Sequence, residues 1–229
     1  MTHVVLLAHG SPDPRSAAAV RDATAAIARR VDAQVTAAFL DHDVPRLAES
    51  VADAARDDDV VVLPLLVSTA FHARVDVPAA VAALPRSVSL LDPIGHPAEV
   101  LDELLRRGGG PSVVMSAGTT VDSERAAFAD AVAAASWRTG VPAVAAYATG
   151  PGPRLAEIAV PGRTLVVPWL LAPGRLLDGV LGDASAAGCA VVSNGLLGEP
   201  AFRDAVVRRV SGAVTASAPT RLLSQVTPR

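Results

Sequence analysis

Leu6-Leu7-Ala8-His9-Gly10-Ser11 is an apolar run that ends on a histidine, a glycine and a hydroxyl group. Residues 4–7 are typical of a buried β-strand. Pro12-Asp13-Pro14, followed by an alanine-rich segment, predicts a helix start that is capped by Asp13 or Ser11. His9 is then expected at the carboxyl end of a strand. In open parallel α/β sheets ligands bind at that edge, because the strands stop there and helix N-termini point their N–H groups into the crevice.

A second stretch has the same pattern. Residues 60–67, Val-Val-Val-Leu-Pro-Leu-Leu-Val, are followed by Ser68-Thr69-Ala70-Phe71-His72, so a histidine again comes just beyond a buried strand. Neutral imidazoles bind Fe²⁺, Co²⁺, Ni²⁺ and Zn²⁺, and two ligands leave several coordination positions open. We therefore expect His9 and His72 to converge on one divalent metal ion, although a lone histidine after a strand is more often a hydrogen-bonded structural residue.

Strands and helices alternate regularly along the first half of the chain. Apolar runs and amphipathic spacing predict strands at residues 33–40, 60–67 and 88–91, and helices at residues 14–31, 46–55, 79–83 and 98–107. Steady alternation is typical of a parallel sheet that is covered by helices on both faces. The sequence therefore predicts an α/β fold.

The pattern starts again after Gly108-Gly109-Gly110-Pro111, which we interpret as a linker. Pro45-Arg46-Leu47-Ala48-Glu49 recurs letter for letter at residues 153–157, and the turn at residues 7–11 resembles residues 115–119. We therefore predict an internal repeat, with two similar α/β domains at residues 1–107 and 111–211. Residues 212–229 are rich in Ser, Thr, Ala and Pro and are expected to form a flexible tail.

The two copies differ in their histidines. All five lie within the first 96 residues, and His9 and His72 align with Ala117 and about Leu176. If the imidazoles were needed to build the fold, the second copy would retain them. We therefore expect the chemistry in the first copy only, with the second copy serving as a lid, a wall of the site or a scaffold.

Three further polar residues are judged by their places relative to the predicted strands. Asp41 follows the strand at residues 33–40 at the same edge as His9, where it can add a carboxylate ligand, accept protons or simply stabilise a turn. His96 follows the fourth strand, and a loop role is expected for it. His3 precedes the first strand at the opposite edge and is expected to be exposed.

Composition excludes several classes of protein. The chain has 229 residues, 51% of them hydrophobic and 19% charged, which is enough to bury the cores of two modest domains. A net charge of −3 without a basic stripe argues against nucleic-acid binding. No apolar run approaches the roughly 20 residues that cross a bilayer, and no secretion signal is apparent. The single cysteine excludes an internal disulfide and favours a cytoplasmic location. The sequence is compatible with both a monomer and a homodimer.

Several motifs together resemble the sirohydrochlorin chelatase family of the CbiX type. They are Leu-Leu-Ala-His9-Gly-Ser11 with Asp13-Pro-Arg15, Phe39-Leu40-Asp41 before Pro45, and Pro64-Leu-Leu with His72-Ala-Arg74-Val-Asp76-Val-Pro78. The resemblance implies two chelatase-like domains, each a small parallel sheet flanked by helices, with a tetrapyrrole in the cleft between them. His9 and His72 match the family's metal-binding histidines. Asp41 departs from the family, because many members carry a glutamate there.

The activity that the resemblance implies is a lyase reaction. The family inserts Fe²⁺ or Co²⁺ into sirohydrochlorin in sirohaem or cobalamin biosynthesis, with Ni²⁺ as a further option here. The metal is a co-substrate, and no bound organic cofactor is predicted. Two pyrrole N–H protons must leave while the ion enters the ring. We expect His9 and His72 to hold the ion, and one of them or Asp41 to accept protons.

The substrate that the resemblance implies carries eight carboxylates, so cationic partners are expected around the cleft. Arg15, Arg46 and Arg74 lie near the same loops in the sequence and are candidates for bidentate pairing, as is Ser11 with the helix N-terminus. A metal or tetrapyrrole carrier without turnover is the alternative function. A phosphate-binding α/β domain is a third alternative. It is disfavoured because the chain has no glycine-rich phosphate-binding motif.

Overall fold

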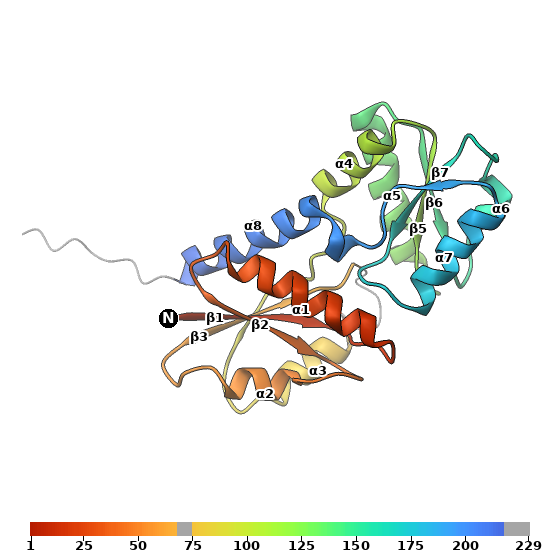
Figure 1. Ribbon diagram of the computed structural model, residues 1–229. Helices are drawn as coiled ribbons and strands as arrows, with labels where there is room; N and C mark the ends of the chain where they lie inside the picture. The colour runs from red at the N-terminus through yellow and green to blue at the C-terminus, as the bar shows by residue number, and fades with distance from the viewer. Residues whose placement is uncertain (68–74, 218–229) are drawn as a thin grey trace, which may run out of the picture.

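The computed structural model describes residues 1–67 and 75–217 and consists of two α/β halves (Figure 1). The candidate residues His72 and Arg74 lie outside the described residues. The N-terminal half contains β1 (Thr2–Ala8), α1 (Pro14–Ala28), β2 (Gln34–Phe39), α2 (Leu47–Ala52), β3 (Asp59–Pro64), α3 (Val77–Ala82), β4 (Ser89–Leu90) and α4 (Ala98–Gly108). The C-terminal half contains β5 (Ser112–Ser116), α5 (Asp122–Thr139), β6 (Ala143–Tyr147), α6 (Leu155–Ile158), β7 (Leu165–Trp169), α7 (Arg175–Ala186), β8 (Ala190–Val191), the short 3₁₀ turn η2 (Leu196–Gly198) and α8 (Pro200–Ser217).

The two sheets have the same topology. Their strand orders are β2-β1-β3-β4 and β6-β5-β7-β8, and every neighbouring pair is parallel. The predicted fold, two similar halves each with a small parallel sheet flanked by helices, is therefore confirmed. In the first sheet Ala8 pairs with Phe39 and Leu7 with Pro64, so β1, β2 and β3 end together. This register brings the segments that follow them to one edge.

Side-chain alternation along each strand divides the interior into three clusters. Val4 and Leu6 of β1 face one large cluster that extends through both halves, whereas Val5 and Leu7 face a cluster within the N-terminal half. A third cluster, which includes Met115, fills the corresponding face of the second sheet. Successive residues of a strand point to opposite faces, so each sheet buries one face in its own half and the other in the shared cluster.

The last helix of each half packs on the other half. Helix α4 contacts α5 and β7, whereas α8 contacts α1, β1 and β3, and Figure 1 shows α8 next to α1 on the N-terminal half. The apolar side chains of these helices complete the shared cluster: Val100, Leu101, Leu104 and Leu105 from α4, and Phe202, Val206 and Val210 from α8. Each sheet is thus covered by a helix from the opposite half, so neither half has a complete core of its own.

Ion pairs reinforce the exchanged helices. Arg138 of α5 donates three hydrogen bonds to Asp102 of α4, at 2.7–3.1 Å. Arg107 of α4 donates to the carboxylate of Glu199, just before α8, at 2.7 Å. Asp102 and Glu199 are largely buried, with side chains 12% and 10% exposed, so their arginine partners compensate the loss of hydration. Helix α8 also continues past Gly212, where a flexible tail was expected, to Ser217.

His3 corrects one expectation from the sequence. It belongs to β1 rather than to the segment before it, and its side chain is fully buried. Its Nε2 atom lies 2.8 Å from the hydroxyl of Thr36 on the neighbouring β2. The reason is that β1 begins at Thr2 and is an inner strand, so even its second residue is covered.

Candidate active site

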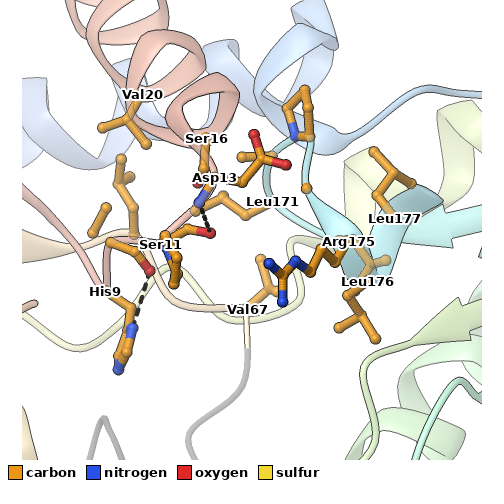
Figure 2. A pocket seen from close by; sticks show the side chains of 18 of the residues that line it. His9, Ser11, Asp13, Ser16, Val20, Val67, Leu171, Arg175, Leu176 and Leu177 are labelled. Carbon is orange, nitrogen blue, oxygen red and sulfur yellow. Dashed lines mark hydrogen bonds between the residues drawn. The ribbon is translucent and has the colours of Figure 1, made fainter. Parts of the chain in front are cut away.

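A cavity of about 550 Å³ opens between the two halves at the carboxyl ends of the strands (Figure 2). The N-terminal half contributes residues 8–13 with Ser16 and Val20, and residues 65–67. The C-terminal half contributes residues 170–177, between the end of β7 and the first turn of α7. Sites of this size and position are typical for small molecules in α/β proteins.

His9 lines this cavity at the end of β1. Its Nδ1 atom lies 3.1 Å from the carbonyl oxygen of Gly10. A carbonyl can only accept a hydrogen bond, so Nδ1 carries a proton, and in the neutral imidazole the lone pair is then on Nε2. A backbone partner of this kind orients an imidazole for metal binding through the other nitrogen. The sequence had predicted the position of His9, and its placement in the lining of a cavity follows from the structure.

Asp41 lies beside His9, because its backbone N–H donates to the carbonyl oxygen of His9 at 2.7 Å. Its carboxylate accepts hydrogen bonds from the N–H of His42 at 2.8 Å and from the Arg46 guanidinium at 3.2 Å. These two hydrogen bonds, the backbone one first, lower the pKa of Asp41 below its ordinary value. Asp41 therefore stays ionised at neutral pH, which suits the attraction of a cation better than the acceptance of a proton.

The close approach of the two loops depends on Gly10. Its φ of +93° is in the left-handed region, and a Cβ atom there would lie 1.8 Å from the carbonyl oxygen of Asp41. The N–H of Ser11 also donates to the Asp43 carboxylate at 3.2 Å, across the same gap. Only glycine allows both the turn and the contact, so this residue holds His9 and Asp41 together.

Ser11 and Asp13 are engaged in the turn that begins α1. The Ser11 hydroxyl oxygen accepts from the N–H of Asp13 at 3.1 Å, and the Asp13 carboxylate accepts from the N–H of Arg15 at 3.0 Å. Asp13 is therefore the N-cap of α1, and of the two expected caps it is the one used. Both side chains line the cavity and remain within reach of a ligand there.

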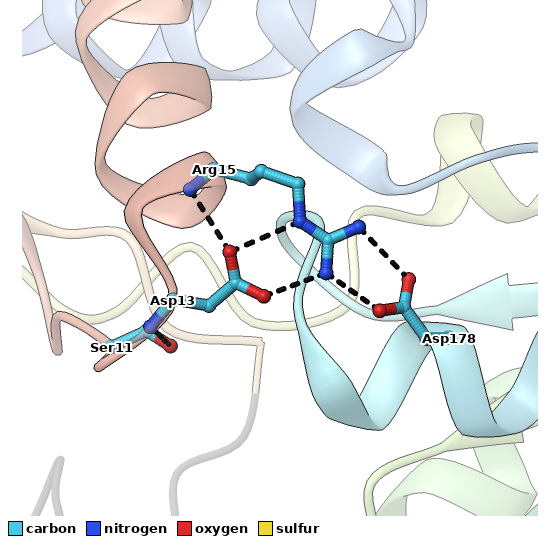
Figure 3. Close-up of polar contacts among 4 residues, drawn as sticks. All are labelled: Ser11, Asp13, Arg15 and Asp178. Carbon is cyan, nitrogen blue, oxygen red and sulfur yellow. Dashed lines mark hydrogen bonds and ion pairs between the residues drawn. The ribbon is translucent and has the colours of Figure 1, made fainter.

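Arg15 bridges the two halves (Figure 3). Its guanidinium donates to the Asp13 carboxylate and, at 2.6 and 3.2 Å, to both oxygens of Asp178 on α7. These carboxylates raise the pKa of Arg15, with Asp13 the larger influence. The positive charge of Arg15 is thus already balanced by two anions, whereas its place in the sequence predicted a partner for substrate carboxylates.

Arg46 forms hydrogen bonds within its own loop, and the second copy of the repeat has a similar arrangement. Its guanidinium donates to the carbonyl oxygen of Leu40 at 2.7 Å, and its N–H donates to the Glu49 carboxylate. In the second copy Arg154 donates to the carbonyl oxygen of Tyr147 at 2.9 Å and its N–H to Glu157. The copy keeps the bond to the glutamate and a bond to a carbonyl at the strand end, one residue earlier than in the first copy, without any histidine nearby, so a role in shaping the loop accounts for Arg46.

His42 is a further imidazole at this edge of the first sheet. Its ring centroid lies 6.4 Å from that of His9, and its Nε2 lies 3.5 Å from the Asp41 carboxylate. His42 has a φ of 63°, and the equivalent residue of the copy is Gly150, with a φ of 69°. Within residues 1–67 and 75–217, no group of three or more His, Cys, Asp or Glu side chains is arranged around a common metal position.

Comparison with protein families finds a match for the first half of the chain. Residues 3–108 match the CbiX family. The match begins in β1 and ends with α4, and it includes His9 and Asp41. The family resemblance expected from the motifs is therefore confirmed for this part of the chain. A comparison with functionally curated proteins finds no match.

Three solved structures share the fold of the whole chain. SirB from Bacillus subtilis with Fe³⁺ is 21% identical with a TM-score of 0.73, covering 95% of this chain and 98% of its own. The sirohydrochlorin chelatase SirB from Bacillus subtilis subspecies spizizenii in complex with cobalt is 20% identical, with the same score and coverage. CbiX, the terminal enzyme for biosynthesis of sirohaem in denitrifying bacteria, is 20% identical with a TM-score of 0.63, covering 93% and 99%.

The residues that the C-terminal half adds to the cavity were not predicted from the sequence. Leu170, Leu171, Leu176 and Leu177 form an apolar wall, and Arg175 lies among them. They lie outside the CbiX match, in a copy without histidines. A signal was nevertheless present, because Leu176 aligns with His72. If the two copies face each other across a cleft, this segment must line it.

His96, in the loop between β4 and α4, is structural, as expected. Its Nδ1 accepts a hydrogen bond from the indole N–H of Trp169 at 2.9 Å, and its ring centroid lies 5.1 Å from that of Phe128. Burial lowers the pKa of His96, against a smaller opposing influence of Glu124. Protonation of Nδ1 would abolish this hydrogen bond between the halves.

We expect the stability of the protein to depend on pH through His96. The pKa of His96 is lowered in the folded state. Its contribution to the free energy of unfolding is therefore complete above its pKa in the unfolded state, about 6.5, and is lost as the pH falls through its pKa in the folded state. The free energy of unfolding, measured with urea at pH 8.0, 6.0 and 5.0, should therefore decrease with falling pH. Burial lowers the pKa of His3 too, so His96→Gln should weaken the dependence without abolishing it. An unchanged dependence in His96→Gln would contradict the assignment.

The helices of the described residues include none that is long and apolar enough to cross a membrane.

Proposed function

We propose that the protein is a metal chelatase of the lyase class that inserts Fe²⁺ or Co²⁺ into sirohydrochlorin or a related tetrapyrrole. The observation that carries this proposal is the position of His9, within the CbiX match and in the lining of a cavity to which both halves contribute. Two structures with the same fold, SirB with Fe³⁺ and SirB in complex with cobalt, support the choice of metals. A cytoplasmic location also belongs to the proposal, since Cys189 is a free thiol.

Metal insertion exchanges one divalent cation for two pyrrole N–H protons. The site must therefore deliver the cation and remove the protons. His9, with its lone pair on Nε2, and His72 are proposed to hold the ion beside the ring. The backbone of Asp41 is bonded to that of His9, and its ionised carboxylate at this sheet edge, outside the cavity lining, adds a negative charge that favours the arrival of a cation. As the ion moves to the ring nitrogens, the released imidazoles become available to accept the protons.

The walls of the cavity suit a flat macrocycle with a charged rim. Leu66 and Val67 come from the N-terminal half and face the leucine-rich segment 170–177 of the other half. Apolar walls on both sides would bury the ring faces and exclude water, which strengthens interactions between charges within the site. The metal enters from the side on which His9 lies.

A direct assay tests the proposal against the carrier alternative. The protein is mixed with sirohydrochlorin and Co²⁺, or with Fe²⁺ without oxygen, and the loss of the metal-free absorption spectrum is followed over many turnovers. A chelatase converts substrate in large excess over protein. A carrier binds metal or tetrapyrrole at one equivalent and leaves the rate of conversion at the value without protein, which would refute the enzymatic proposal.

The charge of Asp41 provides a second test. We expect Asp41→Asn to lower kcat/KM for the metal about tenfold at low ionic strength, because it removes a negative charge from the sheet edge that carries His9, and to lower it less at high salt. Asp41→Glu, which restores the residue many family members carry, should retain most of the activity. The measurement is the insertion rate as a function of metal concentration at two salt concentrations. Equal rates for wild type and Asp41→Asn at both would exclude this role.

A further inference from the structure

Arg175 is the arginine that the C-terminal half places in the cavity. It is the first residue of α7, and among the described residues it is the one Arg or Lys in the cavity lining. Figure 2 shows its side chain extending from α7 toward the N-terminal half. The half without histidines therefore contributes the main positive charge of the cavity wall.

Within residues 1–67 and 75–217 the guanidinium of Arg175 makes neither a hydrogen bond nor an ion pair, and its charge acts on Asp13 only as a minor electrostatic influence. The acids around it are already engaged, because Asp13 and Asp178 both bind Arg15. Arg175 and Arg15 thus differ sharply although both lie at the boundary between the halves. One charge is balanced by two carboxylates, and the other is left available to an anion in the cavity.

The backbone of Arg175 is fixed against the turn that carries His9. The preceding residue, Gly174, accepts the first helical hydrogen bond of α7 from the N–H of Asp178 at 2.9 Å. A Cβ atom on Gly174 would lie 3.9 Å from the Cβ of Asp13 and 4.0 Å from the hydroxyl oxygen of Ser11. The start of α7 therefore packs directly on the 9–13 turn, and Arg175 keeps a set position relative to His9.

We propose that Arg175 binds a peripheral carboxylate of the tetrapyrrole and thereby sets the orientation of the ring relative to His9. The inference rests on the proposed function, and it assigns a substrate-orienting role to the second copy. A guanidinium pairs with a carboxylate through two parallel hydrogen bonds, which fixes direction as well as distance. The leucines on either side of Arg175 would contact the ring while its charge engages the rim.

The test compares three variants in the full-length protein. Arg175→Gln removes the charge, and Arg175→Lys keeps it but loses the bidentate geometry. The matched control is Arg163→Gln, since Arg163 is an exposed arginine in the turn before β7, at the opposite edge of the sheet. The dissociation constant of metal-free sirohydrochlorin is measured by fluorescence, and Co²⁺ binding is measured separately without tetrapyrrole.

We expect Arg175→Gln to raise the dissociation constant for sirohydrochlorin about tenfold, as for the loss of one charge-assisted pair, with Co²⁺ binding unchanged. Arg175→Lys should recover part of the affinity, and Arg163→Gln should bind as wild type does. Equal affinity in Arg175→Gln and wild type would overturn the inference, as would an equal loss in Arg163→Gln. Failure of wild type to metallate sirohydrochlorin would instead refute the proposed function, so the two failures are distinct.

Discussion

His9→Ala is expected to lower the rate of metal insertion by about 100-fold or more, because the loss of even an indirect partner of a metal ligand typically costs about 10- to 100-fold. The variant should fold normally. His9 follows β1 at the mouth of the cavity and is half-buried, so its removal leaves no hole in the core. The affinity for metal-free sirohydrochlorin should change little, since apolar walls and Arg175 remain.

The measurement is the turnover rate with Co²⁺ and sirohydrochlorin, together with a Co²⁺ titration followed by absorption. Ala117→Ser, at the equivalent turn of the second copy, is the matched control and should retain wild-type activity. The two variants are expected to differ because the first copy has a metal-binding imidazole at this turn, whereas the second copy has Ala117. If His9→Ala turns over as fast as wild type, His9 does not hold the metal and the proposed mechanism is wrong.

Gly10→Ala is expected to cause a large loss of stability, about 3 kcal/mol or more. The added Cβ would lie 1.8 Å from the carbonyl oxygen of Asp41, at a φ of +93°. Backbone must move to relieve that overlap, and the segments that move carry His9 and Asp41. Activity per folded molecule should therefore fall together with stability.

The internal repeat supplies a matched control for Gly10→Ala. Gly118 has a φ of +99°, and a Cβ there would lie 2.0 Å from the carbonyl oxygen of Thr149, the residue equivalent to Asp41. Gly118→Ala should lose a similar amount of stability but retain its activity per folded molecule. Gly140→Ala, with a φ of +70° and no atom within 4 Å, should cost only about 1 kcal/mol.

Urea unfolding and insertion assays at low temperature separate the two effects. Loss of activity in Gly118→Ala equal to that in Gly10→Ala would show that the methyl group acts through global unfolding and not through the site. Wild-type stability in Gly10→Ala would show that the two loops do not touch as described.

The residues of the candidate site differ in how far the sequence could predict them. His9 and Asp41 were placed at one sheet edge because strand ends of a parallel sheet coincide, and the register of β1 with β2 agrees. Arg15 was also placed beside this edge, but its partner Asp178 comes from the other half, so its bridging contact could not be predicted. Arg175 was missed because residues of the second copy were judged by the histidines they lack.

The sequence by itself determined the α/β class, the repeat and the position of His9, because these follow from local alternation and from matches within the chain. Only the tertiary structure decided which sheet each terminal helix covers. The apolar face of α4 or α8 specifies that it is buried but not against what, and both helices cross to the opposite half. That exchange joins the halves through one shared core, and the first turn of α7, packed on the 9–13 turn, places Arg175 in the same cavity as His9.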